Sequence, residues 1–141
     1  IEQQLLHLAR ENKKEIHGLE TLEFQASIMD SIPYKDQAVE LLKTIDSLKK
    51  SKIYFDSMVV AYKKQDLAEI ERMLNDEEYG MEDKQDIMLD KRNRNWVEQL
   101  KTIMQKDGVF IAVGAGHLPG QAGLIALLRK EGYVLRPLEN K

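Results

Sequence analysis

One histidine at the end of a glycine-rich turn is the residue best placed for chemistry in this chain of 141 residues. The stretch VGAGHLPG, residues 113–120, ends the apolar run VFIAV at 109–113 and places His117 just before a helical pattern. In parallel α/β sheets, ligands gather at the carboxyl ends of strands. An imidazole there can bind a metal ion or transfer a proton near neutral pH. His117 is therefore the first candidate for a catalytic and metal-binding residue.

The glycines of this turn allow three interpretations, of which the first is a dinucleotide loop. That loop needs G-x-G-x-x-G and an acidic residue about 20 positions later. Here Pro119 stands where the third glycine is required, and Arg136 lies where the acid is expected. The second interpretation is a purely structural turn capped by His117. The third is a catalytic or metal-binding histidine, with Gly114 and Gly116 giving a substrate close access to the backbone.

Two glutamates near the amino terminus are candidate partners for His117. Glu20 ends the short segment 15–20, for which we predict a strand, and Glu23 follows three residues later. If this strand belongs to the same sheet as 109–113, Glu20 lies on the same edge as His117. Either glutamate could then act as a metal ligand or a general base. The alternative is that both are ordinary solvated side chains.

A second polar cluster lies in the run KRNRNW at 91–96. Arg92 and Asn93 can bind a carboxylate or orient a carbonyl oxygen, because a guanidinium group offers several donors in a fixed plane. Both are candidates for the catalytic machinery, and Arg92 also for substrate binding. Arginine on a helix is more often solvated or part of a weak surface ion pair, so this alternative stays open.

The elements that must position these residues follow from hydrophobic spacing. A block of helices is predicted within 21–106, and Asp66 with Glu69 three residues later is typical of a capping box. A β-α-β unit is predicted over 109–138, with strands at 109–113 and 133–136. The predicted fold class is therefore α/β, with a central sheet, a C-terminal β-α-β unit and a helical insertion, in one domain over 1–141.

Composition limits the classes of partner. The chain is 43% hydrophobic and 32% charged, as in globular proteins, and its net charge of −3 gives no reason to expect nucleic acid. No apolar run approaches the length of a transmembrane segment. Without cysteine, a metal site would use imidazole and carboxylate, which suits Zn, Mn or Co. The sequence opens inside a helical pattern without methionine, so we expect part of a larger domain, a processed start being the alternative.

Several short motifs together resemble the TraB/GumN family, which includes the Tiki-type metalloproteases and is distantly similar to erythromycin esterase-like and haem-binding lipoprotein groups. The resemblance covers about residues 15–141. It is carried by GLET at 18–21 with Glu23 and Gln25, RNxxW at 92–96, VGAGHLPGxxGL at 113–124, and Gly132-Tyr133.

The resemblance implies an α/β domain with a helical insertion and a site built from two G-x-x-H motifs and conserved acids. Gly114 to His117 matches the second motif, Glu20 matches the acid of the G-L-E segment, and Arg92-Asn93 matches the family's R-N pair. The first G-x-x-H is absent, because Lys14 rather than glycine precedes Ile16-His17 at the corresponding place. This departure agrees with the expectation that the chain is part of a larger domain, which would hold the other histidine.

Two functions follow as expectations. The first is a hydrolase that cleaves a peptide or another carbonyl substrate with water activated by a divalent ion, held by His117 and Glu20 among others. The second is a domain of the same fold that binds a ligand such as haem, or acts as a scaffold, without catalysis. The family further suggests export, and unpaired sheet edges suggest a homodimer.

Overall fold

The computed structural model describes residues 2–78, 84–106 and 108–138, and the chain divides into two compact units, 1–31 and 32–141. The first unit contains α1 (Glu2–Glu11) and α2 (Leu22–Asp30). α2 begins as the sequence predicts, because the Thr21 hydroxyl accepts a hydrogen bond from the Phe24 backbone N–H at 3.1 Å and so caps the helix. The segment between the two helices has no regular secondary structure beyond turns.

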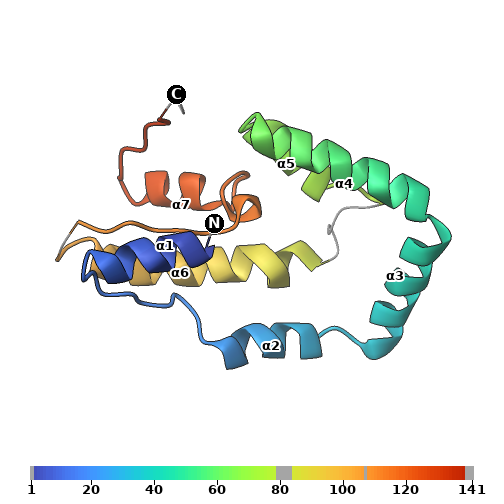
Figure 1. The fold of residues 1–141 in the computed structure, drawn as a ribbon, viewed down its shortest axis with the longest axis horizontal. Helices are drawn as coiled ribbons and strands as arrows, with labels where there is room; N and C mark the ends of the chain where they lie inside the picture. Colours follow the sequence, from blue (N-terminus) through green and yellow to red (C-terminus); the bar gives the residue numbers. More distant parts are fainter. Residues whose placement is uncertain (1, 79–83, 107, 139–141) are drawn as a thin grey trace. The chain divides into compact units, whose positions relative to one another are not determined.

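The second unit begins with three helices, α3 (Tyr34–Asp46), α4 (Leu48–Lys63) and α5 (Leu67–Leu74) (Figure 1). α4 packs against α5 around the buried side chains of Ala61, Ile70 and Met73. The spacing of three between Ile70 and Met73 places both on one face of α5, which explains why that face is buried.

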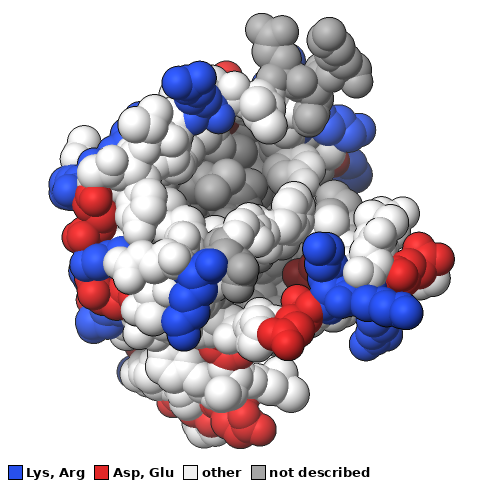
Figure 2. Space-filling view, turned by 90° about the vertical axis from the view of Figure 1, so that its left-hand side faces the viewer, with Lys and Arg blue, Asp and Glu red and all other residues white. Residues whose placement is uncertain are grey.

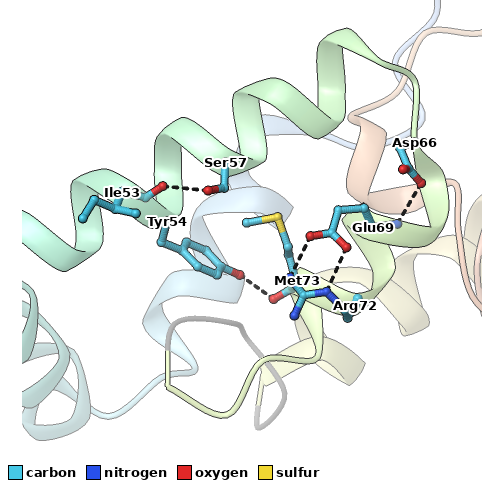
Figure 3. Close-up of polar contacts among 7 residues, drawn as sticks. All are labelled: Ile53, Tyr54, Ser57, Asp66, Glu69, Arg72 and Met73. Atoms are coloured by element: carbon cyan, nitrogen blue, oxygen red, sulfur yellow. Dashed lines mark hydrogen bonds and ion pairs between the residues drawn. The ribbon is translucent and has the colours of Figure 1, made fainter.

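Polar contacts cap α5 and join its end to α4, as Figure 3 shows. The Asp66 carboxylate accepts a hydrogen bond from the Glu69 backbone N–H at 3.0 Å, which confirms the predicted helix start. The Tyr54 hydroxyl of α4 donates to the backbone carbonyl of Met73 near the end of α5. The end of α5 is therefore tied to α4 by both apolar packing and a hydrogen bond.

The rest of the second unit is built on α6 (Lys91–Ile103), which continues a short π-helical segment, η2 (Asp86–Asp90). α6 packs against α7 (Leu124–Lys130), which lies beside it in Figure 1. The buried residues of α6 recur every three or four positions, as expected for one helix face: they are Asn93, Trp96, Val97 and Leu100. Between α6 and α7 the short 3₁₀ turn η3 (Ala115–His117) contacts both α5 and η2.

The predicted α/β fold is wrong, because the described residues form helices and turns but no strand. Segment 15–20 is irregular, and 109–113 and 133–136 are not assigned to strands. A β-strand is defined by hydrogen bonds to a partner strand. Within the described chain, no such ladder joins the two C-terminal segments to each other or to a third segment. In place of the predicted β-α-β unit over 109–138, the structure has the 3₁₀ turn η3 and the helix α7, while 109–113 and 133–138 have no regular structure.

The described residues of the predicted helical block 21–106 do form helices, from α2 to α6. Pro33 separates α2 from α3, and α4 runs without a break from Leu48 to Lys63. Residues 79–83 of the predicted helical block 21–106 lie outside the described residues. Figure 2 shows acidic and basic side chains interspersed on the face it draws, without a patch of a single sign. None of the described helices is long and apolar enough to cross a membrane.

Candidate functional site

His117 is buried at the end of η3, where the residue is only 7% exposed. Apolar contacts with residues of α4 and α5 support the turn η3. Ala115 packs against the cluster of Ala61, Ile70 and Met73, and a Cβ placed on Gly116 would lie 3.6 Å from Leu74. His117 is therefore positioned by the packing of η3 on α5, which is itself tied to α4.

Asn93 of α6 makes a close polar contact with the ring of His117. Asn93 Oδ1 lies 2.7 Å from His117 Nδ1, and Asn93 Nδ2 donates to the backbone carbonyl of Ala122 at 2.9 Å. Asn93 is 1% exposed, so water has little access to this chain of hydrogen bonds. Buried polar groups of this kind are satisfied by each other and define one arrangement of the side chains.

Trp96, one turn after Asn93, contacts the face of the same imidazole. The centroids of the two rings are 4.4 Å apart and their planes are inclined by 41°. The guanidinium carbon of Arg92 lies 5.0 Å from the indole centroid, which is within the range of a cation–π contact. Arg92 Nη1 also donates to the carbonyl of Met88 at 2.8 Å. Trp96 thus lies between His117 and Arg92 in one series of contacts.

The conformational requirement for glycine in this turn lies at Gly120 and Gly123 rather than at Gly114 and Gly116. Gly114 has a φ of −63°, which any residue can adopt, and Gly116 is likewise outside the left-handed region. The left-handed glycine of the turn is Gly120, with a φ of +84°. Gly123 is required for a steric reason, since a Cβ there would lie 1.9 Å from the Pro119 carbonyl oxygen. The continuation LPGQAG at 118–123 is therefore a tight turn that leads directly into α7.

One known protein family matches nearly the whole chain. The profile of the TraB/PrgY/gumN family matches residues 1–137 of the chain. The chain belongs to the TraB/PrgY/gumN family. No curated protein and no solved structure is significantly similar to it.

Within this TraB/PrgY/gumN family chain, the predicted site residues fall into two groups. Arg92, Asn93 and His117 belong to the second unit and are brought together around Trp96. Glu20 and Glu23 belong to the first unit. That Glu20 shares an ion with His117, and that Gly114, Gly116 and Arg92 bind substrate, stay predictions.

The two glutamates lie at the start of α2, where Glu20 is half-buried and Glu23 is exposed. Glu20 accepts a hydrogen bond from Gln25 Nε2 at 3.4 Å. Hydrogen bonds from its own backbone N–H and from the Thr21 side chain lower the pKa of the Glu23 carboxyl. Glu23 is therefore ionised at neutral pH, which suits a ligand or a base rather than an acid.

The family resemblance implies a divalent ion. Such an ion needs several ligating side chains close together. A catalytic zinc usually has about three protein ligands. Among the described residues, no group of three or more His, Asp or Glu side chains could hold a metal ion. His117 fits as one ligand, but the described residues do not form a complete site. Two surface clefts of about 500 and about 530 Å³ are lined by residues of α4, α5 and the following turn, and neither includes His117.

Trp96 and Ala122 belong to the cluster around His117, but neither was named as a site residue from the sequence. In the sequence Trp96 was named only as part of the motif RNxxW, whereas in the structure its ring contacts His117. The spacing of three between Asn93 and Trp96 was the available signal, since it puts both on the helix face that meets the glycine turn. The role of the Ala122 carbonyl had no signal in the sequence, because every residue carries that group.

Proposed function

We propose that this chain is part of a metal-dependent hydrolase of the TraB/GumN type, which acts on a peptide or another carbonyl substrate. Membership in the family supports the proposal. The observation that carries it furthest is the support of a buried imidazole by Asn93 and Trp96. These contacts hold the ring in one orientation, which suits a ligating or proton-transferring histidine.

In this proposal His117 supplies one of the ligands to a divalent ion, Zn, Mn or Co. Glu20 would supply another ligand, and so would a second histidine like that of the first G-x-x-H motif, which this sequence lacks. When bound, such an ion lowers the pKa of a water molecule and polarises a carbonyl group. The residues of this chain hold the imidazole rigid, exclude water from its Asn93 side, and keep Arg92 next to the Trp96 ring.

Metal binding by the full-length protein tests the proposal. Titration with Zn²⁺, Mn²⁺ and Co²⁺ in a calorimeter should give about one ion per chain for at least one metal. His117→Ala should abolish this binding. His17→Ala is the matched control, because His17 is exposed and pairs with Glu15, and it should bind as the wild type does. No uptake by the wild type would refute the metal-dependent function.

A non-catalytic domain that binds haem or another ligand is the alternative, since an imidazole held in this way can also ligate haem iron. Addition of haemin to the metal-free protein separates the two. A Soret shift that is lost in His117→Ala, together with no uptake of the three divalent ions, would favour the alternative.

A further inference from the structure

The side-chain amide of Asn93 has only one orientation that satisfies its neighbours. The backbone carbonyl of Ala122 is an acceptor and cannot donate, so the Asn93 atom 2.9 Å from it must be the amide nitrogen. The other terminal atom, which faces the His117 ring, is therefore the carbonyl oxygen Oδ1.

This orientation determines which ring nitrogen of His117 carries a proton. Asn93 Oδ1 is an acceptor only, and it lies 2.7 Å from His117 Nδ1. A hydrogen bond at that distance requires a proton on Nδ1. In the neutral ring the lone pair is then on Nε2, because neutral imidazole carries one N–H.

The glycine turn determines where the Ala122 carbonyl lies. Gly120 has a φ of +84°, and Gly123 has no room for a Cβ beside the Pro119 carbonyl. Both conditions belong to the single tight turn that contains Ala122. The turn thus provides the acceptor that orients Asn93, and Asn93 in turn orients His117.

We propose that Asn93 is a positioning residue, which is oriented by the Ala122 carbonyl and holds His117 in the tautomer with the proton on Nδ1, so that Nε2 is the nitrogen offered for ligation or proton transfer. The use of Nε2 rests on the proposed function, whereas the tautomer does not. Side chains that bond the second nitrogen of a metal-binding histidine commonly fix its tautomer and strengthen ligation.

The tautomer can be measured directly in the metal-free, full-length protein labelled with ¹⁵N-histidine. Long-range ¹H–¹⁵N correlation spectra distinguish a ring nitrogen that bears a proton from one that bears a lone pair. Comparison with His117→Gln assigns the signals of His117. At a pH where the ring is neutral, Nδ1 should show the shift of a protonated nitrogen and Nε2 that of a nitrogen with a lone pair.

Variants of Asn93 test the cause. Asn93→Leu removes the acceptor and should raise the fraction of the tautomer protonated on Nε2, whereas Asn93→Asp retains an acceptor and should keep the proton on Nδ1. Asn95→Leu, an exposed position on the same helix, is the control and should leave the spectrum unchanged. Circular dichroism reports whether each variant folds.

Two results would overturn the inference: a wild-type spectrum with the proton on Nε2, or an unchanged tautomer in folded Asn93→Leu. The wild-type spectrum alone decides the first, even if Asn93→Leu does not fold. If the wild type binds a divalent ion, Asn93→Leu should weaken its affinity about 10- to 100-fold. Absence of metal binding with the Nδ1–H tautomer present would refute the proposed function and leave the positioning role intact.

Discussion

The imidazole of His117 rests against the indole of Trp96, with ring centroids 4.4 Å apart and planes inclined by 41°. The two residues come from different segments, the 3₁₀ turn η3 and helix α6. Trp96 is 5% exposed, and its Nε1–H has no acceptor among the described residues. A buried donor without a partner is costly, so the contacts of the indole ring must outweigh this cost.

Removing the indole should therefore destabilise the second unit strongly. Trp96→Ala leaves a large cavity beside His117 and Arg92, and loss of a buried aromatic side chain of this size costs about 3–5 kcal/mol. Chemical denaturation followed by circular dichroism measures the change. Tyr34→Ala is the control, because Tyr34 is 78% exposed. This surface substitution should change stability by less than about 0.5 kcal/mol. Equal losses in the two variants would contradict the central role of Trp96.

Replacement by alanine should destabilise the protein at Gly123 but not at Gly108. In Gly123→Ala the new Cβ would meet backbone atoms, at 1.9 Å from the Pro119 oxygen, so the turn must shift. A loss of at least about 1–3 kcal/mol is expected, as for overpacked sites. In Gly108→Ala nothing lies within 4 Å of the Cβ, and φ is outside the left-handed region. Thermal unfolding should show that variant unchanged or up to about 1 kcal/mol more stable.

The sequence predicts the helices of the molecule better than its site, for reasons that particular residues show. Helix starts are local, as with Thr21 and Asp66, whose side chains cap the residue three positions later. The apolar run 109–113 has the composition of a strand, and its side chains alternate, with Ile111 and Val113 half-buried and Phe110 exposed. A sheet also needs partner segments, which composition cannot supply.

The candidate site depends on contacts between distant residues in the same way. The sequence singled out Asn93 and His117, which are 24 positions apart, by their types and by a family motif. Their contact depends on the packing of α6 against α7. The turn that contains Ala122 leads into α7 and therefore also lies beside α6. Residue types therefore indicated the candidates, whereas the hydrogen bond and its direction required the structure.

Acid should weaken the ion pairs at the start of α6. Hydrogen bonds from Lys91 and then Arg94 hold the pKa of Asp86 below its ordinary value. A group with a lowered folded pKa stabilises above its unfolded pKa, and this contribution is lost as the pH falls through the folded pKa. The thermal midpoint should thus decrease below about pH 4. The decrease should be smaller in Asp86→Asn and in high salt, since all three groups are exposed.

Alkaline pH should act on the contact between α4 and α5 through Tyr54. Burial is the main cause that raises the pKa of its hydroxyl, which donates to the Met73 carbonyl. A raised folded pKa means that this contribution is complete below the unfolded pKa, about 10, and is lost as the pH rises through the folded pKa. Tyr54→Phe should lose about 0.5–1.5 kcal/mol at about pH 7 and show a flatter decline of stability above about pH 10. Denaturation at neutral pH and at several alkaline pH values measures both effects, with Tyr34→Phe as the exposed control. An alkaline decline as steep in Tyr54→Phe as in the wild type would show that another group causes it.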